Sequence, residues 1–178
     1  MFAIVLAALD RSGSVLPILC AMAVHELAHI VMMLACGGQV RRLTLRFADL
    51  QIAASGLGYR QELLSALAGP LVNLICGAAF CMQRPSFAAY SLMLGIYNLL
   101  PVWPLDGGRM IRCVVLARLP ITQAEHISEI VSFAACAVLL LIGVFLTFFR
   151  KSGLWPLGTA AYLTVRLLML ARRTDAVQ

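Results

Sequence analysis

Five long apolar stretches, separated by polar connections, dominate the pattern of hydrophobic and polar positions along the chain. The stretches are residues 14–36, 63–82, 86–105, 130–149 and 154–171. Each is about 18–23 residues long, which at a rise of about 1.5 Å per residue matches the roughly 30 Å apolar thickness of a bilayer. The pattern therefore predicts five transmembrane helices. A shorter apolar segment, residues 2–9, is interpreted as an interfacial, re-entrant or truncated helix.

The connection formed by residues 37–62 has a pattern of its own. Apolar and polar residues alternate with a period of two in residues 42–47, and a second extended piece, residues 50–54, precedes Gly56 and Gly58. Such alternation is typical of a half-buried strand. We predict a small β-hairpin associated with the cytoplasmic face of the membrane; the alternative is an amphipathic surface loop.

The composition agrees with a membrane location. Hydrophobic residues make up 62% of the 178 residues and charged residues only 12%, whereas soluble domains average about 45–50% and about 25%. An ordinary soluble protein, a disordered chain and a disulfide-rich secreted scaffold are excluded. We predict an all-α polytopic membrane protein with about five to six transmembrane helices. It forms a single membrane-embedded domain, 1–178, with a core at residues 14–110 and a C-terminal helix pair at residues 126–171.

The charge pattern gives an orientation in the cell membrane. The formal net charge is +6, and the basic residues lie almost entirely in the connections. Nine of them lie in residues 37–62, residues 106–129 and the C-terminus, against four on the opposite side. Since the more basic side of a membrane protein faces the cytoplasm, the C-terminus is predicted to be cytoplasmic. The basic charge therefore reflects orientation, and no nucleic-acid partner is expected.

The motif His25-Glu26-x-x-His29 interrupts the first apolar stretch. Residues i and i+4 share a face of a helix, so both imidazoles can bind one metal ion, and Glu26 can accept a proton. A glutamate inside a spanning helix is costly and usually marks a functional site. The alternative is a structural role, in which these side chains join helices by hydrogen bonds.

A catalytic zinc site needs a third protein ligand and an open position. Asp106 closes the run Asn98-x-x-Pro101-x-x-Pro104-Leu105-Asp106-Gly107-Gly108. The prolines interrupt the third helix near its predicted cytoplasmic end, where His25 and His29 are also predicted to lie. Asp106 is a candidate for that third position; the alternative is a helix-ending turn with a solvated aspartate.

These motifs, in this order, resemble those of the site-2 protease family of intramembrane zinc metalloproteases. A further segment, Ala68-Gly69-Pro70-x-x-Asn73, is similar to the middle-helix signature of that family, although its small and polar residues could also serve close helix packing. The resemblance covers about residues 14–110, and the sub-group most similar is the stage IV sporulation protein FB type. No PDZ or CBS domain is expected.

The resemblance implies one zinc ion (Zn²⁺) per chain, bound by His25, His29 and Asp106. It also implies that Glu26 is the general base and that Asn98 helps to position substrate. The active site would face the cytoplasm.

The function implied is that of an intramembrane zinc metalloendopeptidase. It would cleave a transmembrane or membrane-associated protein segment near the cytoplasmic face, in regulated proteolysis such as pro-sigma or anti-sigma factor processing. The expected partners are a membrane-tethered protein substrate, the lipid bilayer and regulatory membrane proteins. Two alternatives stay open: a catalytically inactive relative that binds membrane proteins, and a metal transporter that uses the same ligands.

Overall fold

The structure is a computed structural model, which describes residue 13 and residues 15–46, 49–55, 57–148 and 155–175. The short helix predicted at residues 2–9 lies outside the described residues. The chain divides into two compact units, residues 1–99 and residues 100–178.

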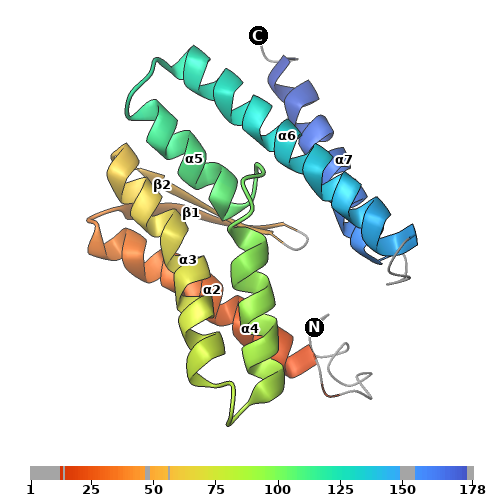
Figure 1. Ribbon diagram of the computed structural model, residues 1–178. Coiled ribbons are helices and arrows are strands. Elements are labelled where there is room, and N and C mark those ends of the chain that lie inside the picture. Colours follow the sequence, from red (N-terminus) through yellow and green to blue (C-terminus); the bar gives the residue numbers. More distant parts are fainter. Residues whose placement is uncertain (1–12, 14, 47–48, 56, 149–154, 176–178) are drawn as a thin grey trace. The chain divides into compact units, whose positions relative to one another are not determined.

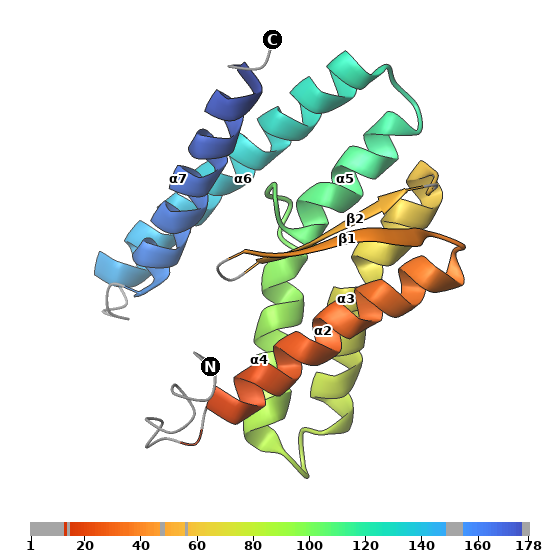
Figure 2. The same cartoon turned by 180° about the vertical axis from the view of Figure 1, so that it is seen from behind.

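The described residues of the first unit form three helices and two strands (Figure 1). They are α2 (Val15–Ala35), β1 (Gln39–Arg46), β2 (Asp49–Ser55), α3 (Tyr59–Ala79) and α4 (Pro85–Asn98). Helices α3 and α4 lie side by side and antiparallel, and α2 packs along α3 on the face seen in Figure 2. The unit is thus a small helical bundle that carries a two-stranded hairpin.

Helix α2 has nearly the bounds that its apolar run predicts, because a strong stop signal follows it. Gly37 adopts a positive φ of 79°, and its N–H donates to the Leu34 carbonyl at 2.9 Å while that of Gly38 donates to the Met33 carbonyl at 3.0 Å. This pair of bonds is a Schellman motif, which satisfies the last carbonyls of the helix.

The strands β1 and β2, which follow α2 and precede α3 in the sequence, pair antiparallel. They lie where the alternation of apolar and polar residues predicts extended chain. The register places Leu45 opposite Leu50 and Thr44 opposite Gln51, with a shift between Val40 and Arg42 that indicates a bulge. The association of this hairpin with a membrane surface stays a prediction.

Small residues allow the helices of the first unit to approach one another closely. A Cβ atom at Gly95 on α4 would lie 3.0 Å from the carbonyl oxygen of Pro70 on α3, and one at Gly77 would lie 3.1 Å from the carbonyl oxygen of Ala88. Such contacts are a common way to join helices in membranes. Helix α4 ends at Asn98 rather than at residue 105, because Pro101 and Pro104 cannot continue it.

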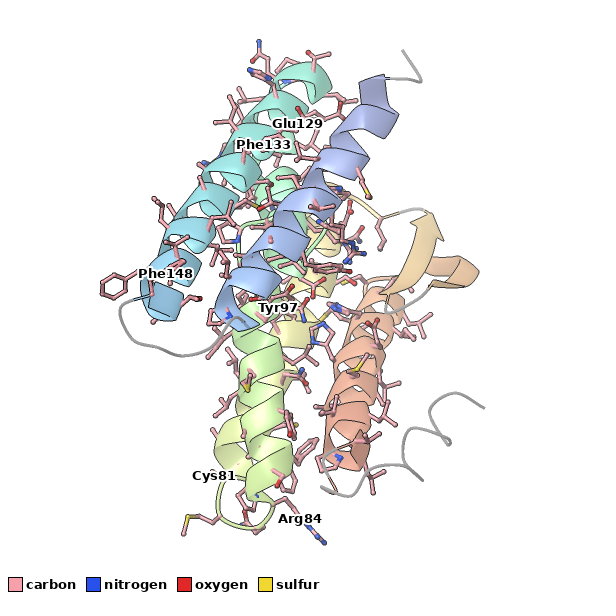
Figure 3. The ribbon with its side chains drawn as sticks, turned by 90° about the vertical axis from the view of Figure 1, so that its right-hand side faces the viewer. Cys81, Arg84, Tyr97, Glu129, Phe133 and Phe148 are labelled. Carbon is pink, nitrogen blue, oxygen red and sulfur yellow. The ribbon has the colours of Figure 1, made fainter. Side chains whose placement is uncertain are left out.

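In the second unit, the described part of the chain forms α5 (Asp106–Leu116), α6 (Ile121–Phe148) and α7 (Trp155–Asp175). Helices α6 and α7 lie side by side in Figures 1 and 2, and Figure 3 shows Phe148 projecting outward at the end of α6. Residues 106–129, which the apolar runs leave as a connection, form α5 and the first turns of α6. Their mixture of polar and apolar residues hid these helices from a search for apolar runs.

Three of the described helices are long and apolar enough to cross a membrane: α2, α3 and α6. Helix α4 has only 14 residues. Helix α7 has 21 residues but includes Arg166, Arg172 and Arg173. The protein is therefore predominantly helical with three candidate membrane spans among the described residues, fewer than the five to six predicted from the apolar runs.

Candidate metal centre

His25 and His29 lie together on one face of α2, as their spacing predicts. Only 4% and 6% of their surface is exposed, and the Nε2 atoms of the two rings lie 3.1 Å apart. Two ligands of one tetrahedral zinc ion, each about 2.0–2.1 Å from the metal, are themselves about 3.3 Å apart. The separation of this donor pair therefore fits a shared zinc ion.

Ser65 on α3 fixes the orientation of His29. Nδ1 of His29 lies 2.6 Å from the backbone carbonyl oxygen of Ser65, and because a carbonyl only accepts, Nδ1 carries the proton. In the neutral imidazole, Nε2 then holds a lone pair that can bind a metal. Oγ of Ser65 also donates to the His29 carbonyl at 3.3 Å. Hydrogen bonds of this kind commonly orient the histidine ligands of metals.

Asn73 on α3 contacts the other imidazole, a role that the sequence interpretation missed. Its Nδ2 lies 3.2 Å from Nδ1 of His25, and the side chain is completely buried. Its Oδ1 has no hydrogen-bond partner among the described residues. A signal was present in the sequence, because Gly69 and Asn73 are four residues apart and so share a face of their helix.

Gly69 provides the space that the histidine rings occupy. A Cβ atom at this position would lie 2.6 Å from Cε1 of His29 and 2.9 Å from Cε1 of His25, closer than real side chains approach. The same face of α3 therefore supplies both the close approach at Gly69 and the amide of Asn73. This face forms one wall of the site.

Glu26 follows His25 on α2 and is half-buried. One residue along a helix turns the side chain by about 100°, so Glu26 projects beside the histidine face rather than from it. Its assignment as the general base stays a prediction.

Asn98 and Asp106 lie at two helix ends. Asn98 is the last residue of α4, and its Nδ2 donates to the Leu94 carbonyl at 3.1 Å. Asp106 is the first residue of α5, where the helix dipole favours a carboxylate. Its Oδ1 lies 3.5 Å from Nη1 of Arg109. Asp106 is only 7% exposed, so it is not a solvated residue in a turn. Zinc ligation by Asp106 and substrate positioning by Asn98 stay predictions.

The loop that precedes Asp106 is held firmly within the second unit. The N–H of Trp103 donates to Oγ of Ser132 on α6 at 3.0 Å, and Val102 is completely buried. A Cβ atom at Gly108 would lie 2.6 Å from the carbonyl carbon of Val102. Glycine at this position therefore lets the first turn of α5 pack against the loop, which fixes where Asp106 lies on that unit.

Comparison with known proteins confirms the resemblance stated above. The model of peptidase family M50 matches residues 84–142. The Stage IV sporulation protein FB of Bacillus subtilis is 28% identical over 138 residues, which are 70% of this chain and 47% of that protein. A zinc metalloprotease of Methanocaldococcus jannaschii is 25% identical over 133 residues, 67% of this chain and 39% of that protein. The chain thus spans less than half the length of these relatives.

The fold is similar to that of the site-2 protease from Methanocaldococcus jannaschii. The TM-score is 0.68 at 19% identity, and the match covers 94% of this chain and 83% of that chain. The chain is therefore similar to site-2 proteases in sequence and in fold. One of these relatives is named a zinc metalloprotease, and the separation of the two histidine nitrogens in this chain fits a zinc ion.

Proposed function

We propose that this chain forms the core of an intramembrane zinc metalloendopeptidase of the site-2 type. The observation that carries the proposal is the buried pair of His25 and His29, whose Nε2 atoms lie 3.1 Å apart on an apolar helix. The bond from Nδ1 of His29 to a backbone carbonyl supports it, because that bond leaves Nε2 able to bind a metal. The similarity to peptidase family M50 supports the reaction class.

His25 and His29 would hold the zinc, with Asp106 as the third protein ligand. Two imidazoles and a carboxylate are a donor set that suits zinc. The bound ion would supply Lewis acidity toward the carbonyl of the peptide bond to be cleaved. The burial of Asp106 and its place at the positive end of α5 support its role as a charged ligand.

Glu26 would transfer a proton from the attacking water to the leaving group. Its carboxylate accepts a proton from the attacking water and returns it to the leaving amide nitrogen, so that the amine departs neutral. Asn98, at the end of α4, would position the substrate backbone by hydrogen bonding. The half-buried position of Glu26 within a candidate membrane span supports a chemical role, since carboxylates are costly there.

The substrate would be a membrane-tethered protein cleaved near the cytoplasmic face. A peptide bond within a transmembrane helix is shielded by its own hydrogen bonds, so the segment must unwind before cleavage. The hairpin of β1 and β2 would receive the unwound segment as an added strand. Processing of a pro-sigma or anti-sigma factor is the regulated reaction that we propose, with regulatory membrane proteins as further partners.

The membrane arrangement that we propose has five to six spans and a hairpin on the membrane surface. Helices α4 and α7 would cross in addition to α2, α3 and α6. The irregular segment after α4 would complete its crossing, because broken helix is tolerated at membrane depth where protein covers it. The excess of basic residues in residues 37–62 and 106–129 supports a cytoplasmic active site and C-terminus.

The proposal is tested by coexpressing the chain with epitope-tagged single-span membrane proteins and comparing it with Glu26→Gln. The variant keeps the size of the side chain but cannot act as a base, so we expect cleavage to fall by at least about 100-fold. Zinc content should stay at about one ion per chain in both proteins. The control is Glu129→Gln, which changes an exposed glutamate on α6 (Figure 3) and should leave cleavage intact.

A second measurement needs no substrate. Combined replacement of His25 and His29 by alanine should remove zinc from protein purified in mild detergent, while helix content persists. Unchanged zinc in this double variant, or near-normal cleavage by Glu26→Gln, would contradict the proposal. An inactive relative would bind zinc but show no difference in cleavage between the intact chain and Glu26→Gln.

A further inference from the structure

Asn73 lies on α3, a helix that is long and apolar enough to cross a membrane. Its polar side chain is completely buried. Its Nδ2 lies 3.2 Å from Nδ1 of His25, whereas its Oδ1 has no hydrogen-bond partner among the described residues. A buried acceptor without a hydrogen bond is destabilising, because it has lost its bonds to water without replacement. The unused acceptor belongs to the side chain that touches a proposed zinc ligand, and this position calls for an explanation.

The contacts that Asn73 and Ser65 make with the two imidazoles indicate which nitrogen of each neutral ring carries the proton. Because Nδ2 of Asn73 can only donate, Nδ1 of His25 accepts, and the proton of its neutral ring lies on Nε2. That Nε2 lies 3.1 Å from Nε2 of His29. The latter accepts, since the Ser65 carbonyl holds the proton of His29 on Nδ1. In this arrangement, Nε2 of His25 has no lone pair to offer a metal.

Binding of zinc through Nε2 requires His25 to carry its proton on Nδ1 instead. The ring keeps one proton in both arrangements, so its charge does not change. Nδ1–H then needs an acceptor, which Nδ2 of Asn73 cannot be. The two ends of a carboxamide are nearly the same size, so Asn73 can turn over in its place and bring Oδ1 to His25.

We infer that Asn73 is a positioning residue, whose carboxamide turns over when the metal binds so that Oδ1 accepts a hydrogen bond from Nδ1–H of His25. The inference rests on the proposed zinc site and assigns a role to the Ala68–Asn73 segment beyond helix packing. Asn73 thereby selects the metal-binding tautomer of His25, as the Ser65 carbonyl does for His29. Loss of such outer partners commonly weakens metal binding about 10–100-fold.

Two substitutions at this position separate hydrogen bonding from packing. Asn73→Leu has a similar shape but no acceptor, so zinc affinity should fall about 10–100-fold. Asn73→Asp offers only acceptors, so it should bind zinc at least as tightly as the unmodified chain. The matched control is Ser91→Ala on α4, which removes the other buried oxygen without a hydrogen-bond partner among the described residues and should leave zinc affinity unchanged.

The affinities are measured by competition with a chromogenic zinc chelator, using the full chain in detergent micelles. A second readout is the nitrogen NMR spectrum of protein with ¹⁵N-labelled histidine, in which only 3 histidines contribute. Addition of zinc to the unmodified chain should move the His25 proton from Nε2 to Nδ1. In Asn73→Asp, Nδ1 should carry a proton before zinc is added, which a purely structural role would not produce.

The outcomes distinguish the inference from the proposed function. If the unmodified chain binds zinc but Asn73→Leu binds it equally well, or if Asn73→Asp is weakened as much as Asn73→Leu, the inference is overturned alone. If the unmodified chain binds no zinc, the proposed function is overturned together with the inference. Retention of zinc by Asn73→Asp, with loss in Asn73→Leu, supports the positioning role.

Discussion

Replacing Gly69 by alanine should displace the imidazoles of His25 and His29, although alanine favours the helical conformation of α3 more than glycine does. The added Cβ would lie 2.6 Å from Cε1 of His29, about 0.8 Å short of the 3.4 Å at which ordinary contacts begin. Alanine is about 1 kcal/mol better than glycine within a helix, so weakening of α3 by poor propensity is excluded. The ring of His29 must therefore move or the two helices must separate.

A displacement of this size is large compared with the tolerance of a zinc site. Zinc–nitrogen distances lie at about 2.0–2.1 Å, so a shift of about 0.8 Å in one ligand removes it from the coordination sphere. Overpacking of a well-packed interior costs about 1–3 kcal/mol, which leaves room for the protein to fold. We expect Gly69→Ala to fold, to lose most of its zinc and to lose cleavage with it.

The assay is zinc content per chain after purification in mild detergent, with thermal unfolding measured on the same samples. Gly77→Ala is the matched control, since its Cβ would lie 2.6 Å from Cδ2 of Leu92 on α4. Both substitutions thus place a Cβ atom of α3 equally close to a side chain of a neighbouring helix. Only Gly69→Ala places it against the imidazoles. Zinc retention by Gly69→Ala, or an equal loss of zinc in Gly77→Ala, would refute the reasoning.

Three further predictions concern other parts of the chain. Ser132→Ala removes the acceptor of the Trp103 N–H and should lower the free energy of unfolding by about 1–3 kcal/mol, as measured by thermal unfolding in detergent. Leu45→Pro removes a backbone donor from β1 and should reduce cleavage with zinc content unchanged; full activity would make the hairpin only a connector. Without native cysteines, Arg60→Cys should react only with reagents that reach the cytoplasm, and Arg84→Cys, at the turn after α3 (Figure 3), only from outside.

The sequence by itself determined the features that depend on neighbouring residues. The bounds of α2 follow from one apolar run and from the glycine after it. The two histidines share a face of this helix because four residues make about one helical turn. The antiparallel strands lie where the residues alternate with a period of two. These features could be predicted because each depends on only a few consecutive positions.

Elements with mixed patterns could not be found in this way. Helix α5 lies inside a region interpreted as a connection, because its polar face breaks the apolar run. Helix α4 ends well before the last apolar residue that follows it, because backbone geometry at the prolines limits the helix more strongly than hydrophobicity extends it.

Only the tertiary structure decided what surrounds the histidines. Asn73 and Ser65 are distant from α2 in the sequence, and they reach His25 and His29 because Gly69 lets α3 approach. The acceptor for His29 is a backbone carbonyl, a group that every residue carries and that no motif can identify. The proton positions on which metal binding depends are therefore set by the packing of one helix against another, which the residue pattern of neither helix specifies.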